Sequence, residues 1–273
     1  MEEMFDSAKT RILEKVQVNI PFTWLMDPQQ NWLEIFTENR IQPEIGLDAE
    51  SLDRFAADDF SRAGRWFADA GCRITVHGPF LDLSPGSPDP EIRSVTHKRL
   101  TQARTAAEAL GPETMVCHAG YDPARYSFIR KEWYKRAADT WNSHGRALWE
   151  KGIRLVLENV YEPDPKDLAD LFEKTDPETT GFCLDVGHLT VFGSFSLSAW
   201  LKRLGPRIRQ LHLHDNCGKT DDHLGMGRGV IDFTPLHEWL KTAGPGPVIT
   251  LEPHRREDLL HSLLFLENHK WFQ

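Results

Sequence analysis

Eight short apolar runs, separated by segments of helical periodicity, constrain the fold of this chain more than any other feature. Most of them are rich in Val, Ile and Leu without strict polar alternation, as expected of parallel strands covered on both faces. The runs are VQVNIPF (16–22), IQPEIGL (41–47), ITVHGPF (74–80), MVCHAGY (115–121), RLVLENV (154–160), GFCLDVGH (181–188), IRQLHLHD (208–215) and VITLEP (248–253). Eight strands that alternate with helices predict an α/β protein with a (β/α)8, or TIM, barrel.

Helical spacing of apolar residues fills the gaps between the runs. The segment after the first run, residues 27–39, is expected to be short or irregular, and residues 255–272 are expected to form a closing amphipathic helix. Because no repeat or linker-like stretch interrupts the pattern, residues 1–273 are predicted to form one domain. The clearest helices, each ending at a glycine that can stop a helix, are predicted over 49–71, 89–111 and 123–152.

Composition and charge narrow the classes of function. The chain is 40% hydrophobic and 27% charged, as in ordinary globular proteins. No apolar run approaches the roughly 20 residues that cross a membrane, and MEEMFDSAKTRILEK lacks the apolar core of a secretion signal, so a cytoplasmic protein without membrane partners is expected. The formal net charge of −9 counts against duplex DNA as a partner, because DNA-binding proteins normally present a basic face. The oligomeric state stays open.

Nine side chains able to bind metal end, or closely follow, six of the apolar segments. Each alone has an ordinary structural explanation, such as a hydrogen-bonded strand histidine or a helix-capping aspartate. Burying an unpaired carboxylate costs several kcal/mol, however, and active sites of such barrels lie at the C-terminal ends of the strands. Their joint occurrence there favours a shared cluster of metal ions. The nine are His77, His118, Glu158, Asp185, His188, His212, Asp221, His223 and Glu252.

The types of ligand narrow the choice of metal. Imidazole and carboxylate without thiolate suit Zn²⁺ first, with Mn²⁺, Fe²⁺ and Co²⁺ as alternatives. One to three divalent ions are expected. The nine candidate ligands exceed what a single ion needs, so a full ligand set would hold more than one. Such ions can activate water and hold a phosphate, or can clamp neighbouring oxygens of a sugar during proton transfer.

Several further residues are candidates to contact a substrate. His212 and His214 alternate with leucines and so face the same side of their run, where one is expected to be a ligand and the other either a support for a ligand or a substrate contact. Lys219 is a candidate to hold a hydroxyl or a phosphate. Four aromatic residues follow strand ends and form either an apolar wall for a sugar or base, or packing at the top of the barrel: Phe22, Trp24, Phe80 and Tyr121.

The order of the motifs resembles the xylose isomerase-like TIM-barrel superfamily, which includes endonuclease IV and sugar or sugar-phosphate isomerases and epimerases. The motifs are H-G-P-F, C-H-A-G, L-E-N, C-L-D-V-G-H, H-L-H-D, D-D-H-L-G-x-G-x-G and L-E-P, and they span the first to the eighth run. The resemblance to endonuclease IV implies three ligand sets. These are His77, His118 and Glu158 for one ion, Glu158, Asp185, His212 and Glu252 for a second, and His188, Asp221 and His223 for a third.

The residues between the ligands depart from both families. Endonuclease IV has Asn-Asp-Ser after the ligand of the seventh strand and Asp-Arg-His in the next loop. Here residues 214–216 read His-Asp-Asn and residues 221–223 read Asp-Asp-His, so the acidic Asp222 stands where an arginine would attract a DNA phosphate. The arginine that epimerases carry shortly after the same histidine is replaced around Gly218 and Lys219.

Three functions are therefore expected to compete. The first is a metal-dependent isomerase or epimerase of a small carbohydrate or phosphorylated substrate. By resemblance, Glu158 and Glu252 would shuttle the proton in it, with His188 as a further active-site residue. The second is a trinuclear phosphodiesterase of the endonuclease IV type that cleaves DNA at abasic sites. The third is a metal-binding barrel without catalytic activity.

Overall fold

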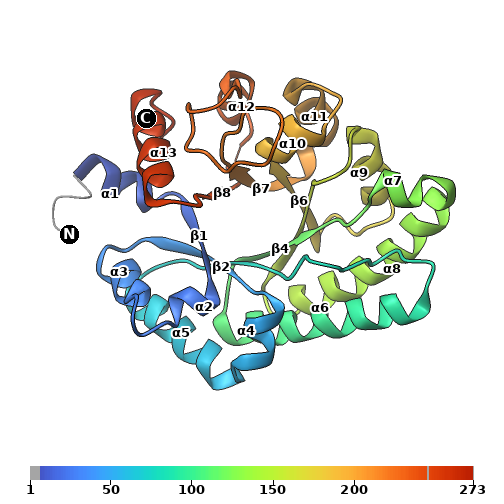
Figure 1. The fold of residues 1–273 in the computed structure, drawn as a ribbon, viewed down its shortest axis with the longest axis horizontal. Coiled ribbons are helices and arrows are strands. Elements are labelled where there is room, and N and C mark those ends of the chain that lie inside the picture. Colours follow the sequence, from blue (N-terminus) through green and yellow to red (C-terminus); the bar gives the residue numbers. More distant parts are fainter. Residues whose placement is uncertain (1–6, 245, 273) are drawn as a thin grey trace.

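Eight parallel strands close into a barrel in residues 7–244 and 246–272, the part of the chain that the computed structural model describes (Figure 1). Because β1 also pairs with β8, the sheet closes on itself and leaves no edge strand in the described residues. The predicted barrel is confirmed. The strands are β1 (Gln17–Pro21), β2 (Gln42–Gly46), β3 (Thr75–His77), β4 (Thr114–His118), β5 (Arg154–Glu158), β6 (Thr180–Asp185), β7 (Ile208–Leu213) and β8 (Val248–Leu251).

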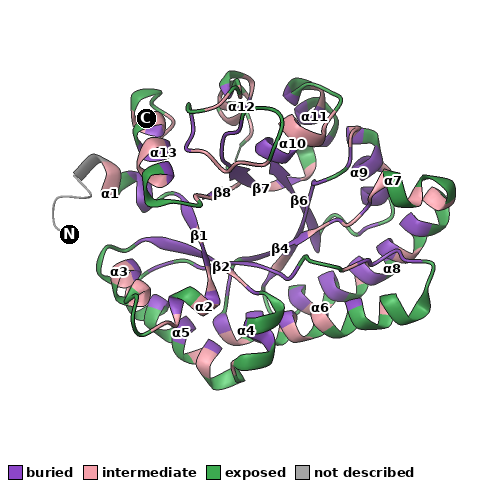
Figure 2. Ribbon diagram, in the orientation of Figure 1, coloured by how far each residue is buried: buried purple, intermediate pink, exposed green. Residues whose placement is uncertain are grey.

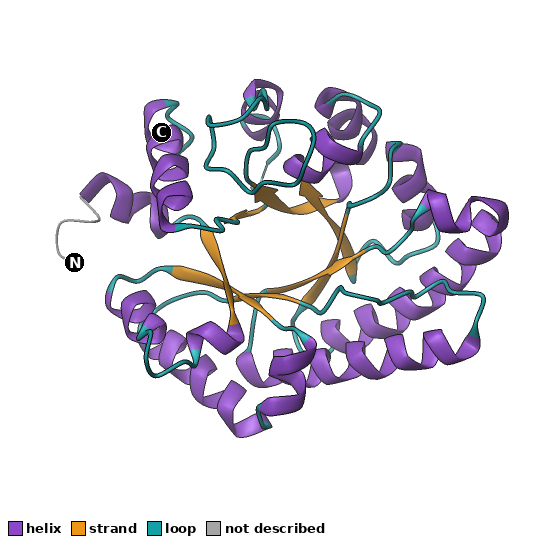
Figure 3. Ribbon diagram, in the orientation of Figure 1, coloured by secondary structure: helices purple, strands orange, loops and turns teal. Residues whose placement is uncertain are grey.

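Helices surround the barrel and cover its outer face (Figure 3). No helix in the described ranges is both long and apolar enough to cross a membrane. The helices are α1 (Ser7–Leu13), α2 (Phe22–Leu25), α3 (Trp32–Glu38), α4 (Ala49–Arg54), α5 (Ala57–Asp69), α6 (Pro90–Leu110), α7 (Pro123–Tyr126), η1 (Ser127–Ile129), α8 (Arg130–Trp149), α9 (Pro165–Phe172), α10 (Val186–Phe192), α11 (Leu197–Leu204), η2 (Gly205–Arg207), α12 (Thr234–Leu240) and α13 (Arg256–Asn268).

Two predicted helices are broken in the structure. The helix expected over 49–71 stops at Arg54 because Phe55 and Ala56 are extended, and the side chain of Asp59 accepts a hydrogen bond from the Ala56 N–H to begin α5. The helix expected over 123–152 consists of α7, a 3-10 turn and α8. Helix α1 was not predicted. The sixth strand ends at Asp185, so the final part of its predicted run forms the first turn of α10.

The core lies inside the barrel and between the barrel and its helices. Figure 2 shows buried residues along the strands and on the inward sides of the helices. Trp133, Trp141 and Trp200 are fully buried, whereas Trp66 and Trp149 lie partly exposed on their helices. Gly64 lets α5 approach the end of α6, since a Cβ atom there would lie 2.5 Å from the carbonyl oxygen of Leu110.

We predict a pH-dependent contribution to stability from a histidine pair between α6 and α8. His144 Nε2 lies 3.0 Å from His97 Nδ1, and burial lowers the pKa of His144 to about 4, with the nearby His97 and Arg104 adding to the shift. An unfolded histidine has a pKa near 6.5, so below that pH the unfolded chain binds a proton that the folded chain does not. Stability should therefore fall as the pH falls, by about 1–2 kcal/mol between pH 7 and pH 5.

Urea unfolding of the wild type and of His144→Gln at pH 7 and pH 5 measures this contribution. The variant should lose less stability than the wild type over this interval, whereas His269→Gln, at the exposed end of the last helix, should behave like the wild type. Equal pH dependence in the wild type and His144→Gln would contradict the prediction.

Candidate metal centre at the mouth of the barrel

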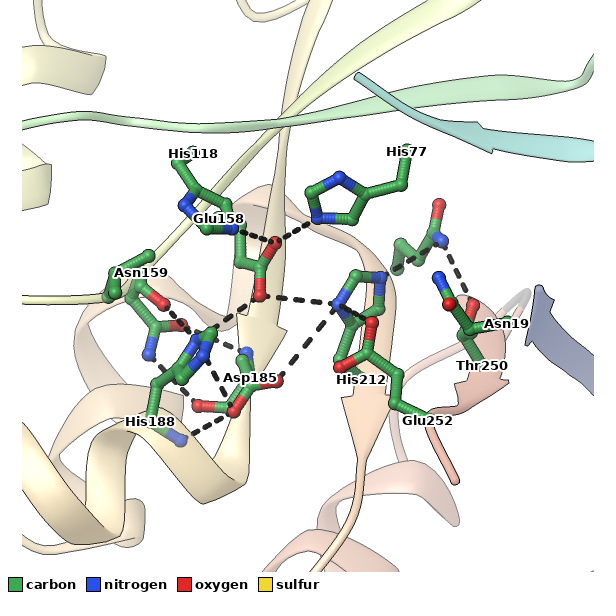
Figure 4. Close-up of polar contacts among 12 residues, drawn as sticks. Asn19, His77, His118, Glu158, Asn159, Asp185, His188, His212, Thr250 and Glu252 are labelled. Carbon is green, nitrogen blue, oxygen red and sulfur yellow. Dashed lines mark hydrogen bonds and ion pairs between the residues drawn. The ribbon is translucent and has the colours of Figure 1, made fainter. Parts of the chain in front are cut away.

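Glu158, the last residue of β5, lies at the centre of a polar cluster at the C-terminal ends of the strands (Figure 4). Its side chain is 1% exposed. Its Oε2 atom lies 3.1 Å from His77 Nε2 and 3.5 Å from His118 Nε2, and its Oε1 atom lies 3.2 Å from Nδ1 of both His188 and His212. Parallel pairing brings these strand ends together, and His118 is the register partner of Glu158. One buried carboxylate thus contacts four imidazoles.

Asp185 and Glu252 extend the cluster on the side of His212. The Nδ1 atom of His212 lies 3.2 Å from Glu252 Oε1 and 4.0 Å from Asp185 Oδ2. Asp185 also caps α10 by accepting a hydrogen bond from the backbone of His188 at 2.6 Å. The side-chain amide of Asn159 bonds the backbone N–H and carbonyl of Asp185, both at 2.9 Å. Asp185 therefore has both of the roles weighed from the sequence: it caps a helix and faces the candidate ligands.

The loop after β7 brings a further group of candidate ligands to the mouth. Asp221 Oδ2 lies 3.2 Å from the Nε2 atoms of both His188 and His223. His214 Nε2 lies 3.7 Å from Asp221 Oδ1 and 3.1 Å from Asp185 Oδ2. His214 is buried beside these residues. This placement suits the predicted role of supporting a ligand, and its contact with a substrate stays a prediction.

Asp215 holds this loop against the barrel. Its backbone exchanges two hydrogen bonds with Leu224, at 2.7 and 2.8 Å. Its carboxylate accepts backbone N–H bonds from Gly227 and Gly229 at 3.0 and 2.9 Å and from Ile231 at 3.1 Å. Asp215 is fully buried, so these bonds replace its water shell. The positions of Asp221 and His223 thus depend on Asp215, for which the sequence suggested no role.

Burial and neighbouring charges shift the pKa values of Glu158 and Glu252 in opposite directions. Burial raises the pKa of Glu158, but the imidazoles of His212 and His118 outweigh it and hold that pKa well below its ordinary value. For Glu252 burial wins, and with the neighbouring Glu158 and Asp185 carboxylates it raises the pKa. Burial also lowers the pKa of His118 to about 3, which favours the neutral imidazole that binds metal.

The donor atoms fit a cluster of divalent ions. Within each group defined below, one candidate ligand atom per residue lies within 4.8 Å of all the others. His214 Nδ1 and Asp221 Oδ1 are buried without a hydrogen-bond partner among the described residues, which is rare for buried polar atoms. All nine predicted ligands belong to these groups. The groups are the central set (Glu158, Asp185, His212 and Glu252), the β3–β4 set (His77, His118 and Glu158), the loop set (His188, His214, Asp221 and His223) and an overlapping group of His77, His212 and Glu252.

Glu44 is part of the site and was not predicted. This buried residue of β2 lies with Oε1 3.2 Å from His212 Nε2. Its Oε2 accepts hydrogen bonds from Thr75 and Thr250, both at 3.1 Å, and from Gln210. A carboxylate in this position fixes the orientation of a metal-binding imidazole. A charged residue inside the apolar run 41–47 was the available signal, but Glu44 lies in the middle of a strand, away from the strand ends where the predicted ligands lie.

The predicted substrate contacts divide into different environments. The prediction that Phe22 contacts a substrate is wrong. Phe22 is fully buried and packs against Phe55 and Phe60, with ring centroids 5.0 and 4.5 Å away, so it belongs to the core. Trp24 is 55% exposed on α2. Lys219 is exposed in the loop after β7, and its predicted contact with a substrate stays a prediction.

A cavity of about 880 Å³ opens beside the cluster. His118, His188 and Asp221 form the part of its lining that belongs to the candidate ligands. Phe80 is half-exposed and stacks on His118, with centroids 4.6 Å apart. The cavity therefore joins an aromatic surface to the candidate metal ligands. Its other aromatic lining residues are Tyr121, Tyr126, Trp141, Tyr161 and Phe192.

An eight-stranded parallel barrel with converging histidines and carboxylates at its mouth defines the class of this protein, and its residues 31–271 match the family model described as xylose isomerase-like TIM barrel. The chain belongs to this family, as its motifs predicted. A Thermus thermophilus protein whose crystal was soaked with ZnCl2 is similar, with a TM-score of 0.77, 30% identity, and coverage of 93% of this chain and 97% of that one.

Two further proteins are similar to this chain. A D-tagatose 3-epimerase-like protein has a TM-score of 0.77 at 24% identity, over 93% of this chain and 99% of its own, and this likeness concerns the fold. A probable endonuclease 4 of Mycobacterium leprae is 27% identical over 207 residues, which are 68% of this chain and 76% of that protein.

We predict that Glu44→Gln weakens Zn²⁺ binding by about 10–100-fold, because the amide is a poorer partner for the His212 imidazole than the carboxylate is. Competition for Zn²⁺ with a chromophoric chelator measures the affinity. Glu50→Gln, which changes an exposed glutamate of α4, is the matched control and should bind like the wild type. Equal affinity in Glu44→Gln and the control would show that Glu44 does not support a metal ligand.

Proposed function

We propose that this protein is a divalent-metal-dependent isomerase or epimerase of a sugar or sugar derivative that acts by proton transfer. One observation carries the proposal most directly. Glu158 and Glu252 come from different strand ends and both lie 3.2 Å from the same atom, His212 Nδ1, at the mouth of the barrel. Two carboxyl groups around one ligand, next to a cavity, suit the removal and return of a proton at one carbon.

The central set would hold the ion on which this chemistry depends. A bound divalent ion would polarise neighbouring substrate oxygens and make the hydrogen on the carbon between them more acidic. Glu158 and Glu252 would exchange the proton with that carbon from opposite faces. Asp185, fixed by Asn159 and by its capping role, would keep the central set in place during the transfer.

The cavity favours an uncharged substrate over a phosphorylated one. Among its described lining residues Arg125 is the only lysine or arginine, and this guanidinium is mostly exposed and pairs with Asp122 at 3.3 Å. Asp82 and Asp221 add negative charge to the lining, whereas burial raises the pKa of the lining residue Glu162 to about 7. Aromatic side chains such as Phe80 and Tyr161 suit the apolar faces of a sugar ring. The volume of about 880 Å³ lies within the range of small-molecule sites.

Phosphodiester cleavage at abasic sites is the second candidate. The β3–β4 set and the loop set support it, because they exceed the ligands that a single-ion epimerase needs. The 27% identity to a probable endonuclease 4 supports it as well. The net charge of −9 and the acidic residues around the cavity oppose it, since a DNA backbone would be repelled.

Incubation in deuterated water with a panel of ketoses and aldoses tests the first candidate. Deuterium should enter the carbon next to the carbonyl group, as observed by proton NMR of the recovered sugar. Glu252→Gln should slow this exchange by about 10²–10⁴-fold, because it removes a group that transfers the proton. Glu257→Gln, which changes an exposed glutamate at the start of α13, is the matched control and should keep the wild-type rate.

Absence of exchange across the whole panel would contradict the isomerase or epimerase function. An abasic-site oligonucleotide serves as the second substrate in the same series. Nicking of this DNA by the wild type, lost in His118→Ala, would establish the phosphodiesterase function instead.

A further inference from the structure

His214 belongs to the loop set, although the resemblance of the chain to endonuclease IV does not imply a ligand at this position. The resemblance implies three ligands there, namely His188, Asp221 and His223. The structure adds His214, which directly follows β7 and is 1% exposed. Its ring is parallel to that of His223, with centroids 3.9 Å apart and an interplanar angle of 4°. The loop set therefore offers three imidazoles and one carboxylate, with one donor atom from each within 4.8 Å of the others.

Gly187 makes the space for the His214 ring. A Cβ atom on Gly187 would lie 1.9 Å from His214 Cε1 and 2.4 Å from its Nε2, distances at which the ring would have to move. The backbone of Gly187 is not among those with positive φ, so its conformation alone does not call for glycine. The Asn216 side chain donates a hydrogen bond of 2.9 Å to the Gly187 carbonyl and ties the two segments together. The placement of His214 is thus supported by its surroundings.

We propose that His214 is a fourth protein ligand that closes the divalent-metal position of the loop set. Sites with four protein ligands are typical of structural zinc, whereas catalytic zinc sites keep a position free for water or substrate. The donors come from α10, from the end of β7 and from the following loop, so an ion there would fasten the loop to the barrel. This inference rests on the proposed function in one respect only, namely that the site binds divalent metal.

A second explanation of His214 is a purely protein contact. Its Nε2 atom lies 3.1 Å from Asp185 Oδ2, so the imidazole could serve only to orient a ligand of the central set. The two explanations differ in what loss of the imidazole does. A fourth ligand controls occupancy of the loop set, whereas an orienting contact affects the central set and leaves the loop set filled.

Metal counts on the full chain separate the explanations. The protein is stripped with a chelator, titrated with Zn²⁺ and analysed by elemental mass spectrometry, and Co²⁺ absorption spectra report the coordination number. His214→Asn should bind one ion fewer per chain than the wild type and should lose the Co²⁺ bands of a four-coordinate site. Gly187→Ala should show the same loss, because its methyl group displaces the ring.

His254→Asn is the matched control. His254 stacks on His223, with centroids 4.0 Å apart, but it does not belong to the loop set. The His254→Asn variant should bind as many Zn²⁺ ions per chain as the wild type. Circular dichroism and melting of the metal-free variants establish that each one folds, and limited proteolysis of the loop 216–231 should become faster with His214→Asn than with the control.

Three results would overturn the inference. One is an unchanged Zn²⁺ count and Co²⁺ spectrum in folded His214→Asn. The second is an equal loss in His254→Asn, which would assign the effect to ring stacking. The third is a wild type that binds no Zn²⁺ at all, which would overturn the proposed metal-dependent function as well. Exchange of deuterium into a sugar together with a count that His214→Asn does not alter would contradict this inference alone.

Discussion

The contact of one buried carboxylate with four imidazoles is the constraint on which the site depends. Glu158 and the surrounding histidines come from β3, β4, β5, β7 and the first turn of α10, and the arrangement of these elements in the barrel brings them within 3.5 Å. Isolated charges at this depth would be strongly destabilising. The pairing of the carboxylate with the imidazoles offsets the cost of burying them. Because the same groups lie close together, a divalent ion can bind between them.

Support for the cluster extends below and above it. Glu44 holds His212 from within the barrel, Asn159 bonds both the backbone N–H and the carbonyl of Asp185, and Asp215 holds the loop that carries Asp221. These residues do not belong to the groups of candidate ligands, yet they determine where the ligands lie. Such supporting contacts distinguish an arranged site from a chance gathering of polar residues.

Apolar period and strand-end position are local properties of the chain, and they were sufficient to predict the barrel and nine candidate ligands. The division of those ligands into sets came from the family resemblance, and His214 was missed as a member of the loop set. The sequence was insufficient where packing between distant parts of the chain determines a helix boundary or the burial of a side chain. The extended pair Phe55–Ala56 divides a helix whose apolar spacing looked continuous, and Phe22 turned into the core although it follows a strand end. Alternation along the seventh strand places His214 on the same face as His212, but the contact of Glu44 with His212 and the meeting of His214 with the loop residues join parts of the chain that are distant in the sequence.

In the loop after β7, some residues are required to hold the backbone in place, and others can be substituted without altering its path. Asp215 binds backbone N–H groups only, and Gly229 is needed because a Cβ atom there would lie 2.1 Å from the Asn216 carbonyl oxygen. Gly227, with φ near 80°, is needed for its backbone conformation. Between them Arg228 is exposed. Related proteins can therefore alter the surface of the loop at this position, and with it the charge presented beside the mouth of the barrel, while the loop keeps its path.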